Sequence, residues 1–374
     1  MGNNLTKEEL IRYSRHLTLH EVGMDGQIKL KNSKVLIIGI GGLGSPAALY
    51  LAAAGIGALG LMDFDSVDES NLQRQIIYST EDAGKPKLES AKKSIEKLNP
   101  NVKINLYDRK INAENAVEIV QNYDVVIDGT DNLPAKYLIN DACFLSGKPW
   151  VYGSIFRFEG QISVFNLNEC PCYRCAFPEM PSRNLIPSCA EAGVLGVLPG
   201  VIGTMQATEA LKILIGKGEI LSGKMLMYNA LQMTLEAIRI NKNKNCMMCG
   251  ENRKITKLID NENGQKCNVD DEISADELKR MIESKEDFIL VDVREKYEWD
   301  MHNIKMAKLV PLSRIMKGDF GELNEAGKNK TIVLHCKSGG RSLAALEILK
   351  GKGYKRLKSL NEGIEGWAQI CNEV

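Results

Sequence analysis

Short apolar runs alternate with helical stretches over the first two thirds of the chain. Residues 5–30 have a mixed pattern that indicates helix, and residues 192–215 give an apolar stretch followed by another helix. Between them lie six strand-like runs, VLIIG, ALGLMDF, KINLYDR, DVVIDGTD, PWVYGS and GQISVF. Strands that alternate with helices are typical of a doubly wound, mostly parallel sheet, so the pattern predicts an α/β, Rossmann-like fold.

The uncharged segment from Val35 to Met62 has a second interpretation, because its length alone would suit a membrane span. It contains seven glycines, however, with Ser45 and Pro46 between its halves. Strands buried on both faces read as continuous apolar runs, so the segment favours a strand, a glycine turn, a helix of small residues and a second strand. We therefore expect no membrane association.

The pattern changes after Cys249. Residues 251–272 are polar and charged and lack apolar periodicity, so we interpret them as a linker. Helical and strand-like runs then return, as ISADELKRMIES, FILVDVRE, TIVLHC, SLAALEILKGKG and RLKSL. The chain is therefore predicted to contain one domain over residues 1–250, this linker, and a second, smaller α/β domain over residues 273–374.

Composition narrows the class of protein. The 374 residues suit two or three domains, and 48 Lys and Arg balance 48 Asp and Glu, so no net charge favours nucleic acid or an anionic membrane as a partner. Ten cysteines are too few for a disulfide scaffold at this length, and no secretory signal is visible. We expect a cytoplasmic protein whose cysteines serve metal or thiol chemistry.

A glycine-rich turn predicts a nucleotide site. Gly39, Gly41, Gly42 and Gly44 follow a strand and open a helix, the context in which backbone N–H groups bind phosphate. Asp63 ends the next strand, where an acidic residue can bind ribose hydroxyls. These features alone would also suit a nicotinamide or flavin enzyme, or a tight structural turn.

Residues further along favour a triphosphate over a dinucleotide. Arg74 and Lys87 add two cations near the phosphate-binding turn, which suits a pyrophosphate leaving group. Asp131 follows another strand, so we expect it on the ligand side of the sheet, where it could hold Mg²⁺.

Two Cys-x-x-Cys pairs predict a metal site. Cys172 and Cys175 form one pair, Cys246 and Cys249 the other, with 70 residues between the pairs. Two pairs with this internal spacing suit a closed tetrahedral zinc site, which would join the end of the first domain to its sheet. A redox role is the alternative for either pair alone, and Cys170 has no partner in this scheme.

A second anion-binding loop lies near the C-terminus. Cys336 follows the strand TIVLH and precedes a helix, with Lys337 and Arg341 beside it. Loop N–H groups, a helix N-terminus and nearby cations all stabilise a sulfur anion, although a buried, unreactive thiol is the alternative. Cysteine phosphatases place five residues between Cys and Arg, whereas this loop has four, Lys337 to Gly340, which makes a smaller cradle.

The first domain resembles the molybdopterin-synthase adenylyltransferase (MoeB) and ThiF proteins, the bacterial branch of the ubiquitin-activating family. The motifs that carry the resemblance are Arg12-Tyr13-Ser14-Arg15, GIGGLGS, DFDSVDESNLQRQ, GKPKLESAK, DGTDN, FRFEGQISVF and CYRC, over about residues 5–250. The resemblance implies an ATP site with Mg²⁺ at Asp131. The residues implied around ATP are Gly39, Gly41, Gly42, Gly44, Asp63, Asp65, Asn71, Arg74, Lys87 and Asp131.

The same resemblance implies a homodimer, in which Arg15 reaches the nucleotide of a partner subunit. It also implies that the C-terminal glycine carboxylate of a small carrier protein attacks the α-phosphate of ATP, giving an acyl-adenylate and pyrophosphate. A carboxylate is already an anionic nucleophile and needs no general base, so positioning and charge neutralisation can supply most of the rate. Cys189 lies where relatives carry a cysteine on a loop that crosses the active site. It is either a thiol that bonds transiently to the activated carrier or a packing cysteine.

Residues 273–374 resemble the rhodanese family of sulfurtransferases. The resemblance rests on the Cys336 loop, on LVDVRE before it and on NEGIEGW after it, while Met301-His302-Asn303-Ile304 departs from the usual Gly-His-Ile. It implies that Cys336 carries a persulfide, held by the loop amides and Arg341.

Together the two resemblances imply a fused enzyme. The first domain would activate a small ubiquitin-like carrier ending in Gly-Gly, and the second would supply sulfur from a persulfide or thiosulfate donor, leaving a C-terminal thiocarboxylate. Such carriers serve molybdenum cofactor, thiamine, tRNA or cysteine synthesis. The alternatives are a nicotinamide-dependent oxidoreductase with a fused rhodanese-like domain and a nucleotide-gated binding module whose rhodanese-like domain only docks partners.

Overall fold

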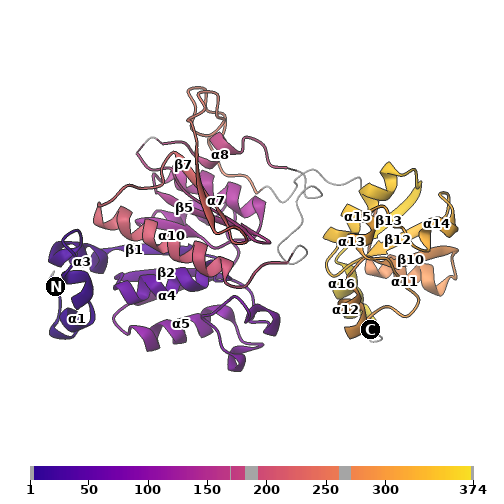
Figure 1. The fold of residues 1–374 in the computed structure, drawn as a ribbon, viewed down its shortest axis with the longest axis horizontal. Coiled ribbons are helices and arrows are strands. Elements are labelled where there is room, and N and C mark those ends of the chain that lie inside the picture. Colours follow the sequence, from indigo (N-terminus) through magenta and orange to yellow (C-terminus); the bar gives the residue numbers. More distant parts are fainter. Residues whose placement is uncertain (1–3, 169, 182–192, 261–270, 372–374) are drawn as a thin grey trace. The chain divides into compact units, whose positions relative to one another are not determined.

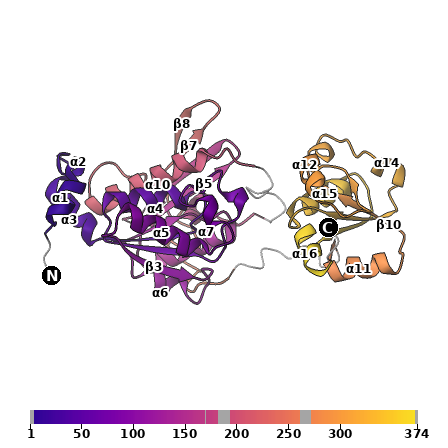
Figure 2. The same cartoon turned by 90° about the horizontal axis from the view of Figure 1, so that it is seen from below.

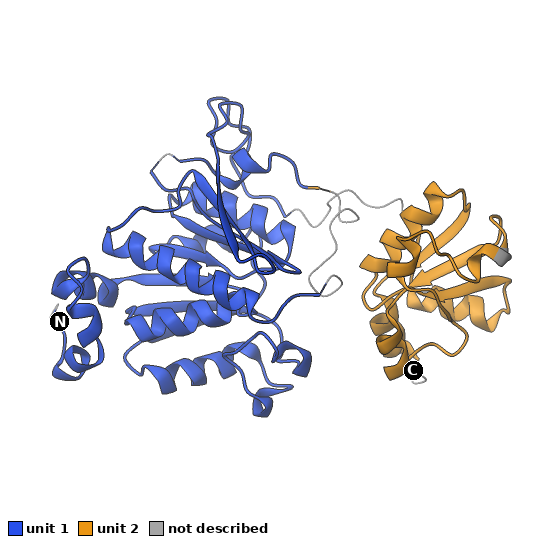
Figure 3. Cartoon of the chain, in the orientation of Figure 1, with its two compact units in different colours: residues 1–180, 192–262 blue, residues 181–191, 263–374 orange. Residues whose placement is uncertain are grey.

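The chain folds into two compact units. The computed structural model describes residues 4–168, 170–181, 193–260 and 271–371. The first unit comprises residues 1–180 and 192–262, and the second contains residues 263–374 (Figure 3). Each unit is built on its own sheet.

The first unit contains an eight-stranded sheet of order β3-β2-β1-β4-β5-β6-β7-β8. Its strands are β1 Lys34–Ile38, β2 Ala58–Asp63, β3 Lys103–Asp108, β4 Val125–Asp128, β5 Trp150–Phe156, β6 Glu159–Phe165, β7 Lys224–Asn229 and β8 Thr234–Arg239. β3, β2, β1, β4 and β5 are parallel, and β6, β7 and β8 continue the sheet antiparallel. The predicted α/β class and doubly wound sheet are confirmed.

The hairpin of β7 and β8 was missing from the sequence prediction. Every residue of β8 is exposed, so its side chains show no alternation between core and solvent. The hairpin projects from the body of the unit (Figure 2). A strand with no buried face leaves no period-two signal in the sequence, which is why the pattern did not predict it.

Helices cover both faces of this sheet (Figure 1). They are α1 Lys7–Arg12, α2 Ser14–Leu17, α3 Gly23–Asn32, α4 Gly44–Ala54, α5 Lys87–Leu98, α6 Ala116–Val120, α7 Leu133–Leu145, α8 Tyr173–Ala176 and α10 Leu198–Ile215, with short 3₁₀ turns at η1 Glu69–Asn71 and η2 Thr80–Asp82. α4, α5 and α10 lie on one face, and α6 and α7 lie on the other. Among the described residues, no helix has the length and apolar character needed to cross a membrane.

The burial of β1 explains the uncharged run in the sequence. Val35 and Ile37 pack in the core beneath α4, whereas Leu36 and Ile38 pack in the core on the opposite face. All four side chains are almost fully buried, because a central parallel strand is covered on both sides. Residues 34–63 therefore form β1, α4 and β2, as the sequence predicted.

The strand order places a ligand crevice between β1 and β4. The chain adds β2 and β3 on one side of β1 and then returns to place β4 on the other side. The loops that leave β1 and β4 therefore diverge to opposite faces, and ligands of doubly wound sheets bind at this point. Gly39 and Gly129, which follow these two strands, lie in backbone contact: a Cβ on Gly129 would be 2.0 Å from the Gly39 carbonyl oxygen.

The second unit has a five-stranded parallel sheet of order β11-β10-β12-β13-β9. Its elements are β9 Glu272–Ile273, α11 Ala275–Glu283, β10 Phe288–Asp292, α12 Lys296–Met301, β11 Lys308–Leu309, α13 Leu312–Ile315, α14 Leu323–Ala326, β12 Thr331–His335, α15 Gly340–Gly351, β13 Arg356–Leu360 and α16 Gly363–Ile370. β12 is central, with Ile332 and Leu334 in one core and Val333 in the other. The loop that follows β12 therefore leaves from the middle of the sheet.

Candidate functional site

The glycine-rich turn between β1 and α4 is held by side chains from neighbouring segments. Asp63, at the end of β2, accepts a hydrogen bond from the Ile40 N–H at 2.7 Å, and the Tyr78 hydroxyl donates to the Ile40 carbonyl oxygen at 2.8 Å. The Ser45 hydroxyl donates to the Gly41 carbonyl oxygen at 2.6 Å. Burial and the nearby Asp63 carboxylate raise the pKa of Tyr78, so its hydroxyl stays protonated as a donor.

In the turn held in this way, three consecutive backbone N–H groups remain available as hydrogen-bond donors. Within the described chain, the N–H groups of Gly41, Gly42 and Leu43 have no hydrogen-bond acceptor. They precede the first turn of α4, where the helix dipole also favours negative charge. A Cβ on Gly41 would meet nothing closer than the Gln75 side-chain nitrogen at 3.7 Å, an ordinary contact distance, so there is no crowding above Gly41.

At the other three positions of the turn, the packing of the backbone explains why the residue is glycine. Gly39 adopts a positive φ of 87°, and a Cβ there would be 2.7 Å from the Gly129 oxygen. A Cβ on Gly44 would be 2.0 Å from the Gly39 oxygen, and one on Gly42 would press against Pro199 of α10 at 3.1 Å. These three glycines allow the loop, β4 and α10 to pack closely.

Two of the predicted cations lie beside this turn. The Arg74 side chain is within 3.7 Å of the Cβ position of Gly42, and its guanidinium donates to the Ser70 carbonyl oxygen at 3.0 Å. Lys87, the first residue of α5, donates to Asp65 at 2.8 Å and lies 4.0 Å from an Asp63 oxygen. Asp63 thus links the glycine turn to Lys87.

Asp63 also has several partners within the protein. Both of its oxygens already accept backbone N–H bonds, one from Ile40 and the other from Phe64 and Asp65 at 2.9 and 3.0 Å. The carboxylate is 8% exposed. It shapes the glycine turn directly, and only its remaining lone pairs are left for the predicted ribose contact. Asn71, which ends η1, is half-buried.

The loop after β4 combines a buried carboxylate with an exposed one. Asp128 is fully buried and accepts from the Thr130 N–H and hydroxyl and from the Lys136 ammonium at 2.9, 2.6 and 2.7 Å. The Lys136 ammonium also donates to the Thr130 and Gly153 carbonyl oxygens. Asp131 is exposed at the carboxyl edge of the sheet. The buried pair fixes the loop that presents Asp131.

Arg15 is not brought to this turn. Tyr13 packs against Gly55, which caps the C-terminal end of α4, and its hydroxyl accepts from Asn99 at 2.9 Å. Arg15 follows in α2, exposed, at the end of α4 opposite to the glycine turn. Cys189 lies outside the described residues.

The four cysteines of the two Cys-x-x-Cys pairs come together. The sulfur atoms of Cys172, Cys175, Cys246 and Cys249 all lie within 4.8 Å of one another, with separations of 3.5 Å for Cys172–Cys246 and 3.3 Å for Cys175–Cys249. A tetrahedral zinc ion with Zn–S bonds of about 2.3 Å separates its ligands by about 3.8 Å, so the donor set fits zinc. Hydrogen bonds from Cys172 and Cys249 hold the pKa of the Cys175 thiol well below its ordinary value, which favours a thiolate in this cluster. Cys170 is not part of the cluster.

The Cys336 loop encloses its sulfur. Cys336 is fully buried, and its sulfur accepts the Gly339 N–H at 3.1 Å and lies 3.7 Å from the Ser342 hydroxyl. Gly339 needs its positive φ of 98° to turn the chain into α15. The N–H groups of Lys337, Ser338 and Gly340 have no acceptor within the described chain. They form the rim of a cradle for an anion.

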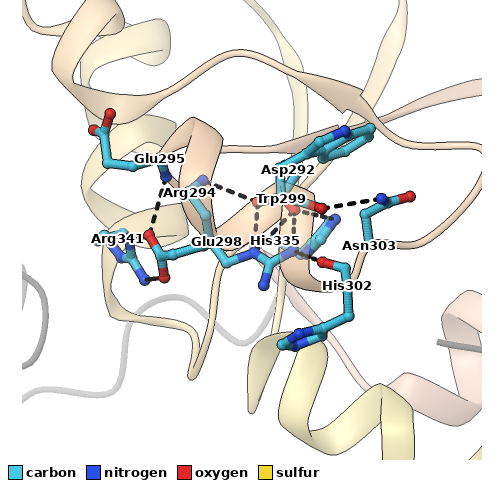
Figure 4. Close-up of polar contacts among 9 residues, drawn as sticks. All are labelled: Asp292, Arg294, Glu295, Glu298, Trp299, His302, Asn303, His335 and Arg341. Carbon is cyan, nitrogen blue, oxygen red and sulfur yellow. Dashed lines mark hydrogen bonds and ion pairs between the residues drawn. The ribbon is translucent and has the colours of Figure 1, made fainter. Parts of the chain in front are cut away.

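Arg341 has a specific partner. Its two terminal nitrogens donate to the two oxygens of Glu298, at 2.6 and 2.7 Å (Figure 4). Glu298 lies in α12 and also accepts from the Glu295 N–H at 3.0 Å. The guanidinium that was predicted to hold a persulfide is therefore bound by a carboxylate.

A second ion pair lies beneath the loop, between two fully buried side chains. Arg294 donates to Asp292 through Nε at 2.9 and 3.0 Å and through Nη2 at 2.6 Å, and Nη2 also donates to the His302 carbonyl oxygen (Figure 4). His335, which precedes Cys336, has its Nε2 3.8 Å from Asp292. Burial lowers the pKa of His335 to about 4, so this imidazole is neutral.

Sequence reasoning missed three residues of these sites. Lys136 and Glu298 lie on helices, and the side chains that they bind lie eight and 43 residues away. Gln206 of α10 donates to the carbonyl oxygens of β4 and β5, at Asp128 and Val151. Only Glu298 carried a signal, since it follows Glu295 by three residues at the start of a helix, the spacing of a capping pair.

Comparisons with known proteins assign a family to each unit. Residues 13–248 match the ThiF family, and residues 274–370 match the rhodanese-like domain. The "probable adenylyltransferase/sulfurtransferase MoeZ" of Mycobacterium tuberculosis is 44% identical, over 98% of this chain and 94% of MoeZ. The "adenylyltransferase and sulfurtransferase MOCS3" of Drosophila sechellia is 40% identical, over 97% of this chain and 84% of MOCS3.

The fold of the first unit has solved counterparts. A crystal structure of E. coli MccB with ATP aligns with a TM-score of 0.56 and 23% identity, over 66% of this chain and 75% of MccB. That likeness concerns the fold alone, whereas the relatives above extend over both units. The chain therefore belongs to the ThiF family, in the group of adenylyltransferase/sulfurtransferases whose ThiF domain is followed by a rhodanese-like domain.

Proposed function

We propose that the first unit adenylates the C-terminal glycine of a small ubiquitin-like carrier protein ending in Gly-Gly. The observation that carries this proposal is the row of N–H groups at Gly41, Gly42 and Leu43, beside Arg74 and Lys87. Donors and cations of this kind stabilise the charge that develops on phosphate when pyrophosphate leaves. The carrier carboxylate attacks the α-phosphate, the bond to the β-phosphate breaks, and an acyl-adenylate forms.

Mg²⁺ belongs to this site in our proposal. Carboxylate oxygen is a preferred Mg²⁺ ligand, and Asp131 presents an exposed carboxylate on a loop fixed by the buried Asp128–Lys136 pair. The bound ion would neutralise phosphate charge. Asp65 is the other exposed carboxylate near the turn, and it pairs with Lys87 in this structure.

The four-cysteine cluster is proposed as a structural zinc site. Its cysteines come from two segments, one ending in α8 and the other following β8, so an ion would join them. Four sulfur ligands leave no open position for a substrate, which is the arrangement of structural sites.

A homodimer is proposed because Arg15 lies at the wrong end of α4 to reach its own glycine turn. Its exposed position suits contact with the nucleotide of a second copy.

The need for free thiols at Cys336 and in the metal cluster suits a reducing cytoplasm.

Sulfur transfer is assigned to Cys336. Its thiolate attacks the outer sulfur of a persulfide or thiosulfate donor, the donor S–S bond breaks, and Cys336 becomes a persulfide. The terminal sulfur then attacks the carrier acyl-adenylate, AMP leaves, and an acyl disulfide joins the carrier to Cys336. A second thiol cleaves that disulfide to release the thiocarboxylate, and a thiol reductant restores both cysteines.

Cys189 is the proposed second thiol. Although Cys189 is not described, the chain resumes beside the glycine turn: Val194 bridges to Arg157, and a Cβ on Gly196 would be 2.4 Å from the Gln73 carbonyl oxygen. Gln73 precedes Arg74. Residues 194–196, which follow the segment that contains Cys189, therefore lie next to the proposed nucleotide site.

The test uses the full chain with a carrier, ATP and Mg²⁺. Exchange of labelled pyrophosphate into ATP should require the carrier, and mass spectrometry should show a thiocarboxylate only when a sulfur donor is added. The matched control is the same carrier without its two terminal glycines. Exchange that is equally fast with this shortened carrier would contradict the proposal.

A further inference from the structure

The rim of the Cys336 loop carries a charge arrangement that sequence alone does not reveal. Arg341 is 7% exposed, and Glu298 binds it through two parallel hydrogen bonds (Figure 4). Parallel bonds between guanidinium and carboxylate are both strong and geometrically specific. The positive charge of the loop is therefore compensated by a carboxylate beside it.

Glu298 is held in its charged form at this position. Its Oε2 accepts from the Glu295 N–H as well as from Arg341, which fixes the carboxylate in the first turn of α12. Burial by itself would raise the pKa of Glu298, but the hydrogen bonds from Arg341 and the Glu295 backbone outweigh it and lower that pKa. Glu298 is thus an anion near neutral pH.

Most of the remaining charges near the loop are paired, although Glu362, whose backbone nitrogen lies 3.4 Å from the Cβ position of Gly339, forms no ion pair among the described residues. Asp292 and Arg294 neutralise each other beneath it, and His335 is neutral. The Lys337 ammonium lies 3.4 Å from Glu365, with both side chains exposed to solvent. An anion that enters the loop therefore meets backbone N–H groups, while every cation described near the loop is paired with a carboxylate.

We propose that Glu298 determines which sulfur donors can load Cys336, by neutralising Arg341 and so selecting against doubly charged donors. The proposal rests on the sulfurtransferase role assigned to Cys336 above. Donors of low charge, such as an organic persulfide, enter the neutral loop without repulsion, whereas thiosulfate brings two negative charges next to Glu298. With thiosulfate the thiolate attacks the outer sulfur, the S–S bond breaks, and sulfite leaves with the bonding electron pair.

The test compares two donors that differ by one charge. Thiosulfate is a dianion, and methanethiosulfonate offers the same outer sulfur on a monoanion; cyanide accepts the sulfur in both assays, giving thiocyanate. In Glu298→Gln, we expect kcat/KM to rise about tenfold for thiosulfate and about threefold for methanethiosulfonate, because a coulombic energy is proportional to the charge of the donor. The ratio of the two values is independent of the amount of folded enzyme.

Two variants serve as controls. Glu298→Asp keeps the charge, so the donor ratio should stay near that of the unmodified chain even if both rates fall. Asp300→Asn removes a carboxylate from the same helix, but Asp300 is exposed and pairs with Lys296, so its donor ratio should change less than about twofold. A ratio in Glu298→Gln that equals the unmodified one would overturn the proposal.

A second readout separates this proposal from the sulfurtransferase assignment. Alkylation of Cys336 by iodoacetate, an anion, and by iodoacetamide, which is neutral, is followed by mass spectrometry of the Cys336 peptide. Glu298→Gln should raise the iodoacetate rate relative to the iodoacetamide rate severalfold. If it does so while no donor ever forms a persulfide, the charge role stands and the sulfurtransferase assignment fails. If the alkylation ratio is unchanged while sulfur transfer proceeds, the charge role of Glu298 fails alone.

Discussion

The two units use the same local device for different anions. In each, a central parallel strand ends in a glycine-containing loop and a helix follows at once, β1 to α4 in the first unit and β12 to α15 in the second. The first loop is uncrowded above Gly41, whereas the second closes around the buried sulfur of Cys336. The first loop is the one we assign to a large external anion, whereas the second encloses a single sulfur atom of the chain itself.

The cations around the two loops also differ, in how firmly their partners within the chain hold them. Arg74 and Lys87 come from segments outside the first loop and are bound by a carbonyl oxygen and an Asp65 carboxylate, partners that a polyphosphate could replace. Arg341 lies in the first turn of α15, beside the second loop, and donates two hydrogen bonds to Glu298. In both units the strand–loop–helix motif supplies backbone N–H groups for an anion. We expect the side-chain charges around each loop to determine whether the bound anion carries a high or a low negative charge.

The largest expected effect separates the two loops. Cys336→Ala should reduce persulfide and thiocarboxylate formation to background, because no other described thiol lies in the second loop, while carrier-dependent pyrophosphate exchange changes less than about twofold. Mass spectrometry of the carrier and of the Cys336 peptide measures both. Cys371→Ala, which removes a half-buried thiol of the same unit, is the control and should retain both activities. A sulfur mass shift on the carrier with Cys336→Ala and thiosulfate would show that the sulfur comes from elsewhere.

Removal of zinc should affect only the unit that contains the first loop. We expect about one zinc per chain, and its removal by a chelator should lower the free energy of unfolding of the first unit by several kcal/mol, because binding energy at a structural site is folding energy. Metal analysis and denaturant unfolding of the full chain measure this. Cys172→Ser should lose the metal, whereas Cys170→Ser, two residues away and outside the cluster, should keep it. Equal zinc content in the two variants would exclude the four-cysteine site.

The second loop should make its own unit sensitive to pH. His335 has a pKa of about 4 in the folded chain, against about 6.5 when exposed, so the unfolded state binds more protons between these values. Stability is therefore fully present above pH 6.5 and is lost as pH falls toward 4, by about 3 kcal/mol. Denaturant unfolding, followed by the fluorescence of Trp299 and Trp367, should show this slope.

His335→Asn isolates the contribution of this imidazole. The variant lacks the titrating group, so its second unit should lose less stability over the same pH range, while the carboxylates of both chains titrate alike. His20→Asn, which changes an exposed histidine of the first unit, should keep the slope of the unmodified chain. Identical slopes for His335→Asn and the unmodified chain would mean that His335 is not the group responsible.

Features that depend on residues close together in the sequence could be predicted. Buried strands, glycine turns and Cys-x-x-Cys pairs each have a signal within about ten residues, and β1, α4 and the four-cysteine cluster are found as expected. The two cysteine pairs, although distant in sequence, could be joined because each has its own recognisable spacing. Other partners that meet only in the folded chain could not be predicted. The pairing of Arg341 with Glu298 joins residues 43 positions apart, and the occupied oxygens of Asp63 depend on the path of the chain around Ile40.

The smallest expected effect tests whether the uncrowded first loop binds phosphate. Gly41 has ordinary backbone angles and space for a Cβ, so Gly41→Ala should change the free energy of unfolding by less than about 0.5 kcal/mol. The added methyl group would occupy the space above the N–H groups, and the KM for ATP in pyrophosphate exchange should rise about tenfold, or about 1.4 kcal/mol of binding.

Gly44→Ala is the contrasting variant: its Cβ would lie 2.0 Å from the Gly39 oxygen, so it should destabilise the first unit by about 2–3 kcal/mol. If the folded Gly41→Ala variant bound ATP with unchanged affinity, phosphate would not approach this loop. The first loop and the Cys336 loop would then share a backbone shape but not anion binding.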